Sequence, residues 1–335
     1  MKKNPAGIVI ILCLTIAAVV GLQFLPPGAL GSVAEPALFR IEKGTTASGV
    51  ASLLHSEKLI RSTVAFRFLL KLSGAETRLE AGTYRIEPGT GPAAIVRMLT
   101  SGDTVKIPVT VPEGSTSRMI AGLLEKAGVC AASEFLAAAR DSTVLARLGV
   151  PGETAEGFLF PDTYVFSGRT DAASIVATMT RNFFEKLAAV SPDGAKDPAA
   201  LRDAVTLASI VEREYRVASE AGLIASVFKN RLTIGMGLQS CATIAYIITE
   251  RQGKPHPNVI KYEDLAIKDP YNTYRWRDLP PGPISNPGRT ALDAVFNGPK
   301  TDYLYFRLVD EKAGRHRFSK TFEEHAGETM SVKSF

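Results

Sequence analysis

Twenty consecutive residues near the amino terminus, Ala6–Leu25, are apolar apart from Thr15 and Gln23. A helix of about twenty residues spans about 30 Å, which matches the hydrocarbon thickness of a bilayer. Lys2 and Lys3 precede the run, so the positive-inside rule leaves the amino terminus in the cytoplasm. We therefore expect a single-pass anchor in the cytoplasmic (inner) membrane, with the working part of the chain on its periplasmic, extracytoplasmic side.

A cleaved signal peptide is the alternative to a retained anchor. Ser32–Ala34 supplies a small-x-small cleavage pattern. However, the apolar core of a cleavable signal usually has 7–15 residues, and this run is longer. The length of the run favours retention, and the Pro-rich stretch up to Pro36 then predicts a short spacer.

The rest of the composition is that of an ordinary globular protein. The chain has 335 residues, 45% of them hydrophobic and 22% charged, which excludes disorder, collagen and coiled coil as the main architecture. A net charge of +5 without long basic runs does not indicate a nucleic-acid partner. Three cysteines cannot form a disulfide framework; Cys130 and Cys241 could pair after export, although each is typical of a small buried side chain.

A short pattern recurs in the first third of the chain. Phe39–Thr45 reads FRIEKGT, Tyr84–Thr90 reads YRIEPGT, and a weaker third copy lies at Val111–Ser115. Each copy precedes apolar residues at helical spacing, which predicts a strand, a Gly turn with a Thr or Ser helix cap, and an amphipathic helix. The first two copies resemble LysM, a small glycan-binding module, and they are equally compatible with a structural repeat that binds no ligand.

The residues from Asp197 to about Tyr215 predict a helix that begins with a cap and Pro198. At 100° per residue, Glu212 lies about 20° from Leu201, inside an apolar stripe that includes Val205. Burial raises the pKa of a carboxyl, and a raised pKa suits a general acid. A structural ion pair with an Arg explains the same position equally well.

Other residues of this helix are assigned by the same geometry. Glu214 lies about 160° from Glu212, which makes it a poor second carboxyl. The predicted polar side carries Arg202, Thr206, Ser209 and Arg213. Further elements are predicted as a helix at Ile175–Leu187, a helix from Ser219 to before Gly235, and a hairpin from Tyr303–Phe306 and His316–Phe318.

Common metal and cofactor motifs are absent from the sequence. It contains no HExxH, GxGxxG, GxxxxGK[ST] or GxSxG pattern, and its four His are scattered. We therefore expect neither a metal nor a cofactor.

Five motifs in one order resemble the endolytic murein transglycosylases, the MltG/YceG-like family. The resemblance extends from about residue 38 to 328, and its motifs are EGFLFPDTY (156–164), LASIVERE (207–214) with ASVFKNRL (225–232), GMGLQS (235–240), YNTY (271–274), and LPPG (279–282) with NPG (286–288). The resemblance implies that Glu212 is the catalytic acid, the residue that the helix geometry also selects. One departure is Cys241-Ala242, where many relatives carry Asp-Pro.

The resemblance implies a membrane-anchored lyase that cleaves the β-1,4 MurNAc–GlcNAc bond of nascent peptidoglycan strands and leaves 1,6-anhydroMurNAc ends. Its substrate is peptidoglycan, and peptidoglycan synthases (penicillin-binding proteins) are compatible partners. The alternatives are a hydrolase (muramidase) and a non-catalytic cell-wall-binding scaffold. Asp162 and Asp269 stay open as second carboxyls.

Amide and aromatic residues of the same motifs are candidate substrate ligands. Gln239 and Asn272 could bind acetamido groups, and Tyr271, Tyr274 and Trp276 could stack on sugars; Glu214 is placed with this set. Tyr-rich loops that only pack on the surface are the alternative. We expect Pro280, Pro281 and Gly282 to shape a groove loop.

The expected fold is α+β: a transmembrane helix, a small LysM-like module, and a mixed α/β catalytic domain with long Pro/Gly/Tyr-rich loops. The expected boundaries are 1–27 for the cytoplasmic stub and anchor, 28–37 for the spacer, 38–105 for the LysM-like module, 106–153 for a connecting strand–helix segment, and 154–330 for the catalytic transglycosylase domain.

Overall fold

The computed structural model describes residues 21–25, 35–42 and 44–331. The chain divides into two compact units, one formed by residues up to Ile107 with Val165–Arg169, the other by Pro108–Tyr164 with the residues from Thr170 onward. The regular elements of the described residues are helices and two-stranded sheets, so the fold is mixed α+β. The segment 106–153, expected to be a connection, belongs from Pro108 onward to the second unit.

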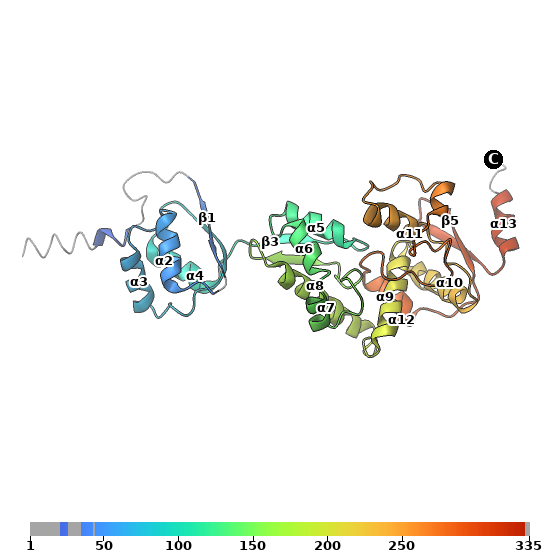
Figure 1. The fold of residues 1–335 in the computed structure, drawn as a ribbon, viewed down its shortest axis with the longest axis horizontal. Coiled ribbons are helices and arrows are strands. Elements are labelled where there is room, and N and C mark those ends of the chain that lie inside the picture. The colour runs from blue at the N-terminus through green and yellow to red at the C-terminus, as the bar shows by residue number, and fades with distance from the viewer. Residues whose placement is uncertain (1–20, 26–34, 43, 332–335) are drawn as a thin grey trace, which may run out of the picture. The chain divides into compact units, whose positions relative to one another are not determined.

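Two copies of the repeat build the sheet of the first unit (Figure 1). The elements are β1 (Ala37–Ile41), α2 (Ala47–Ser56), α3 (Thr63–Leu72), β2 (Gly82–Ile86) and α4 (Pro92–Ser101). β1 and β2 are antiparallel, and Phe39 lies opposite Tyr84, its equivalent in the second copy. Both side chains are buried with Leu54, Phe66 and Leu99 in one hydrophobic core.

The turn of each repeat is closed by its hydroxyl residue. Gly44, Gly89 and Gly114 have φ values of 87°, 80° and 72°, a left-handed conformation that favours glycine. The following hydroxyl donates to the carbonyl three residues earlier: Thr45 to Glu42 (2.8 Å), Thr90 to Glu87 (2.6 Å), and Ser115 to Pro112 (2.7 Å). The predicted strand–turn–helix order is confirmed. The predicted Thr cap is confirmed in the first and third copies, where the next residues, Thr46 and Thr116, accept from the N–H groups of Gly49 and Met119. In the second copy the helix begins after Gly91 without a side-chain cap.

The second unit contains most of the helices. Its elements, with the strands that cross the unit boundary, are β3 (Ile107–Thr110), α5 (Ser117–Lys126), α6 (Ala132–Ala138), α7 (Ser142–Leu148), β4 (Thr163–Phe166), α8 (Ala172–Val190), α9 (Pro198–Glu212), α10 (Ala221–Thr233), α11 (Cys241–Tyr246), α12 (Arg289–Asn297), β5 (Tyr305–Asp310), β6 (Arg315–Ser319) and α13 (Phe322–Ser331). β3 pairs with β4, and β5 is antiparallel to β6. α9 packs against α10 and α12 (Figure 1). The predicted helices and the hairpin are therefore confirmed.

Helix α9 follows the sequence prediction at its start and departs from it at its end. The Asp197 side chain accepts from the backbone N–H groups of Ala199 (2.9 Å) and Ala200 (3.3 Å), and Pro198 is the first helical residue. The helix ends at Glu212 rather than at Tyr215.

Two residues of the predicted polar side of α9, Thr206 and Ser209, are buried, whereas Arg202 and Arg213 are exposed as expected. The Ser209 hydroxyl accepts from Ile284 N–H at 2.9 Å, and the Ser285 hydroxyl donates to the Ser209 carbonyl at 3.1 Å. Buried polar groups are normally hydrogen-bonded, and the loop that contains Ile284 and Ser285 supplies these bonds to Ser209.

The predicted membrane anchor falls largely on residues 6–20, which lie outside the described part of the chain, as does the alternative cleavage site at 32–34. Among the helices of the described residues, none has the length and apolar character to span a bilayer.

Candidate active site

Asn286 joins three distant segments of the second unit. Its Oδ1 accepts from the backbone N–H groups of Gly157 (2.8 Å) and Leu159 (2.9 Å). Its Nδ2 donates to the Ser115 carbonyl (2.9 Å) and to Glu156 Oε1 (2.8 Å). The side chain is fully buried, so all of its hydrogen-bonding capacity is used to hold the third repeat, the EGFLFPDTY motif and the NPG motif together.

Asn286, Glu156 and the three segments that they join form a hydrogen-bonded frame. Glu156 is its charged member. Both of its carboxyl oxygens accept from the backbone N–H of Ser117 (3.0 and 3.1 Å), the first residue of α5. Burial raises the pKa of Glu156 to about 7, against the lowering effect of these hydrogen bonds. The next residue, Gly157, has a φ of 89°, and a Cβ there would collide with Pro283 and Val205, so the frame requires glycine at this position.

Glu212 lies at the end of α9, beside the NPG motif. Its Oε2 accepts from Gly288 N–H at 2.9 Å, and its Oε1 accepts from the Tyr215 hydroxyl at 3.2 Å. Burial raises the pKa of Glu212 to about 7, although the Gly288 hydrogen bond opposes the shift. The predicted rise in pKa is confirmed. The guanidinium of Arg213 donates to the Gly114 carbonyl at 3.2 Å, and no described Lys or Arg forms an ion pair with Glu212, so the structural ion pair gains no support.

Glu212 and its two hydrogen-bond donors, Tyr215 and Gly288, form what we call the Glu212 group. A second carboxyl, Glu113, lies next to this group. A Cβ on Gly288 would collide with Glu113 Oε1, which shows how closely that carboxylate approaches the residue bonded to Glu212. The charge of Glu113 contributes to the raised pKa of Glu212. Sequence reasoning missed Glu113, because the only signal was its place in the Gly turn of the third repeat copy.

A cavity of about 380 Å³ adjoins this group through Arg213. Its wall is apolar at Met119, Ala245, Tyr246 and Ile284 and carries the cations Arg118, Arg213, Lys254 and His256, with His256 counted as a cation only when protonated. Arg118 is paired with Glu250 at 3.1 Å. Lys254 and His256 are exposed and have no ion-pair partner among the described residues, so this cavity can receive an anionic group close to Glu212.

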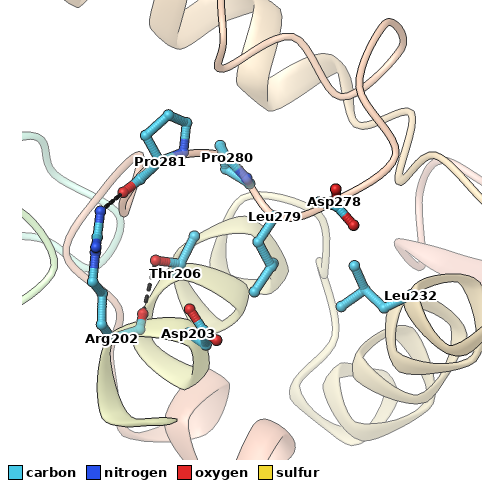
Figure 2. A pocket seen from close by; sticks show the side chains of 8 residues that line it. All are labelled: Arg202, Asp203, Thr206, Leu232, Asp278, Leu279, Pro280 and Pro281. Carbon is cyan, nitrogen blue, oxygen red and sulfur yellow. Dashed lines mark hydrogen bonds between the residues drawn. The ribbon is translucent and has the colours of Figure 1, made fainter. Parts of the chain in front are cut away.

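The Pro-rich loop lines a different cavity, of about 420 Å³, over the first half of α9 (Figure 2). Pro280 and Pro281 lie on its rim, and the Arg202 guanidinium donates to the Pro281 carbonyl. Thr206, which also lines it, precedes Glu212 by about 9 Å along the helix axis at 1.5 Å per residue. The two prolines thus shape a loop, as expected, but around a cavity separate from the Glu212 group.

Gln239 and Glu214 lie on segments that meet near Ser240. Gln239 has a φ of 52° with an exposed side chain, and its backbone N–H donates to the Thr273 carbonyl at 3.1 Å. A left-handed non-glycine residue is uncommon and is often found at functional sites. Glu214 accepts from the Ser240 hydroxyl, and burial raises its pKa. Because α9 ends at Glu212, the predicted angular separation of the two glutamates does not apply.

Asn272 is fully buried, and both ends of its amide are hydrogen-bonded to the backbone. Its Nδ2 donates to the carbonyls of Leu265 (2.9 Å) and Ile267 (2.8 Å), and its Oδ1 accepts from Tyr274 N–H (2.9 Å). Direct binding of an acetamido group would require these bonds to break; as it stands, Asn272 organises the YNTY loop.

The aromatic candidates differ in exposure. Tyr271 packs against Tyr246 with ring centroids 5.1 Å apart and the rings tilted by 36°, and it borders a small apolar cluster. The Tyr274 hydroxyl lies 3.0 Å from Cys241 Sγ. The Cys241 thiol is free and exposed, so the expectation of a buried side chain is wrong there. Trp276 is 52% exposed, which makes it the most accessible of the three candidate sugar platforms.

The remaining candidates have other partners. Asp162 accepts from Asn182 Nδ2 at 3.0 Å, and this hydrogen bond lowers its pKa. Asp269 pairs with Arg251 at 2.7 Å. Cys130 is buried, as predicted. Neither aspartate has a described hydrogen bond to the Glu212 group.

Comparison with known proteins gives one consistent result. The model of the YceG-like family matches residues 39–330. A protein of Bacillus subtilis (strain 168) named endolytic murein transglycosylase is 33% identical over 301 residues, which cover 85% of this chain and 81% of that protein.

Two further relatives extend this similarity. The endolytic murein transglycosylase of Streptococcus pneumoniae serotype 2 (strain D39) is 30% identical over 316 residues, covering 85% of this chain and 56% of that longer protein. A crystal structure of a yceG-like protein from Listeria monocytogenes superimposes with a TM-score of 0.59 at 31% identity, covering 88% of this chain and 100% of that one.

Proposed function

The chain belongs to the YceG-like family, and we propose that it is an endolytic murein transglycosylase, a lyase that cuts peptidoglycan glycan strands internally. The observation that carries the proposal is the Glu212 carboxyl. It lies at the position that the family resemblance assigns to the acid, and its pKa is raised to about 7 by burial. A carboxyl with such a pKa is about half protonated at pH 7, so a large fraction of the molecules can donate the proton.

The proposed reaction needs one carboxyl in two roles. Glu212 donates its proton to the glycosidic oxygen between MurNAc and GlcNAc as the C1–O bond breaks. The muramyl 6-hydroxyl oxygen then bonds to C1, and its proton returns to the Glu212 carboxylate. No water is consumed, and the product is a 1,6-anhydroMurNAc end. Gly288 N–H and the Tyr215 hydroxyl, both bonded to Glu212, hold the carboxyl during this exchange.

Glu113 supports a second candidate function, a hydrolase of the same bond. Inverting glycosidases use a second carboxyl to activate water, and Glu113 is close enough to Glu212 to affect its pKa. Mass spectrometry distinguishes the two reactions, because a hydrolysed reducing end is heavier than the anhydro end by one water.

Other parts of the proposal concern location and binding. The Ala6–Leu25 run is proposed as a single-pass inner-membrane anchor, with the catalytic part outside the cytoplasm. The repeat at 38–105 is proposed as a LysM-like glycan-binding module. The proposed substrate-binding set is Gln239, Tyr271, Tyr274 and Glu214, and Asn272 contributes to it by organising the YNTY loop. Peptidoglycan synthases (penicillin-binding proteins) are the proposed protein partners. The cationic cavity beside Arg213 suits the carboxylates of muropeptides.

Muropeptide analysis of purified peptidoglycan tests the central claim. Glu212→Gln should lower the release of anhydro products by about 10²–10⁴-fold, because it removes the general acid. Glu185→Gln, which changes an exposed glutamate of α8, is the matched control and should keep full activity. A Glu212→Gln protein that melts like the wild type and still releases anhydro products would overturn the mechanism.

A further inference from the structure

Helix α3 of the first unit leaves an apolar stripe uncovered. Phe66 and Leu70 are buried in the core of the unit. On another face, Val64, Phe68 and Leu72 are 75%, 60% and 74% exposed. These three residues are spaced by four, so they form one line along the helix. Single exposed apolar residues are normal, but an aligned row marks an interaction surface.

Basic side chains border the stripe. Arg67 and Lys71 are exposed, and neither forms an ion pair with a described residue. At 100° per residue, both fall with the three apolar residues in an arc of about 140°. The helix contains no Asp or Glu. An apolar stripe flanked by Lys and Arg is the pattern of helices that lie in the interface of a bilayer.

The chain also supplies a means of keeping α3 near a membrane. The apolar run ends at Leu25, and β1 begins at Ala37, so the intervening residues reach about 40 Å at most when fully extended. Gln23, near the end of the run, lines a cavity together with Lys58 and Arg61, which precede α3.

We propose that α3 is a membrane-surface helix of the first unit. Val64, Phe68 and Leu72 insert at the level of the lipid headgroups, and Arg67 and Lys71 contact the phosphates of anionic phospholipids. The inference rests on the proposed anchor, which holds the unit within reach of the bilayer. It assigns to this unit a role in lipid contact that is additional to glycan binding.

The test places a tryptophan on the stripe of the full-length chain. Phe68→Trp in a Trp276→Phe background removes the single native tryptophan, and the protein is reconstituted into vesicles of phosphatidylcholine with phosphatidylglycerol. Replacing the lipids with chain-brominated ones should lower the emission by about twofold, since a headgroup-level side chain meets the upper acyl chain. Tyr262→Trp in the same background, at a 91% exposed site, should not be quenched.

Charge reversal supplies the second arm. Arg67→Glu with Lys71→Glu should abolish the quenching at position 68 in anionic vesicles, whereas Arg85→Glu, at an exposed cation of β2, should leave it unchanged. Absence of quenching in protein that floats with the vesicles overturns the docking alone. If the tryptophan at position 68 is protected from the brominated lipids because the protein self-associates, the stripe binds a second copy and the proposal is overturned. If it is protected only when glycan strands are added, the stripe binds glycan and the proposal is likewise overturned. Protein that does not float overturns the anchor and this inference together.

Discussion

Glu156 and Glu212 are two carboxyls of one structural unit whose pKa values are both raised to about 7 by burial, yet their surroundings differ. Glu156 is 5% exposed and accepts from Ser117 N–H and Asn286 Nδ2. Glu212 is partly exposed and accepts from one backbone N–H and one hydroxyl. A raised pKa occurs at structural and at catalytic carboxyls alike, so access to a ligand is what separates the two.

The contrast predicts that the stability of the protein depends on Glu156 far more than on Glu212. Glu156→Ala leaves Ser117 N–H and one of the two N–H bonds of Asn286 Nδ2 buried without an acceptor, which should lower the free energy of unfolding by about 2–4 kcal/mol. Urea denaturation at pH 7 measures the loss. A Glu156→Ala protein as stable as the wild type would show that the frame does not need this carboxyl.

Glu212 should instead lower stability as the pH rises. Its folded-state pKa of about 7 exceeds the ordinary value of 4.5, so the folded state binds more protons than the unfolded state between these values. Stability from this group is therefore complete below pH 4.5 and is lost as the pH rises through 7. Glu212→Gln, which stays neutral, should match the wild type at pH 4 and exceed it by about 1–2 kcal/mol at pH 8, after allowance for partial exposure.

Denaturation curves of the two proteins at several pH values check this prediction. Glu156 is present in both proteins, so its own titration cancels in the difference. A difference in unfolding free energy that does not change with pH would mean that Glu212 has the same pKa in the folded and unfolded states.

The local features of the fold were predictable because neighbouring residues determine them. Asp197 and Pro198 signal the start of α9, and the apolar spacing placed Glu212 on its buried face. The end of the helix was not predictable, because no Gly or Pro marks it. There the Arg213 N–H bonds to the Ile210 carbonyl three residues earlier, which tightens the last turn.

The site itself depends on contacts between distant segments. Glu113 and Gly288 meet Glu212 only after the third repeat and the NPG motif have folded against α9. Likewise, the burial of Ser209 depends on Ile284, which no pattern within α9 reveals. One helix can therefore indicate the acid, while the groups that tune and hold it follow from the tertiary structure.

The smallest expected effect concerns Glu113, whose carboxylate raises the pKa of Glu212. Glu113→Gln keeps the shape of the side chain and removes its charge, so the pKa of Glu212 should fall by about half a unit. A general acid acts while protonated, so the alkaline limb of the kcat/KM profile on peptidoglycan strands should move to lower pH by the same amount. Glu185→Gln should leave that limb in place.

The product formed by Glu113→Gln then decides what Glu113 does. Unchanged anhydro ends with a shifted limb would identify a residue that tunes Glu212 through charge alone. If the wild type releases hydrolysed ends and the variant loses them, Glu113 activates water, and two carboxyls share the chemistry. An alkaline limb that does not move would show that solvent screens the charge of the exposed Glu113. The raised pKa of Glu212 would then come from burial, which is also the largest cause of the raised pKa of Glu156.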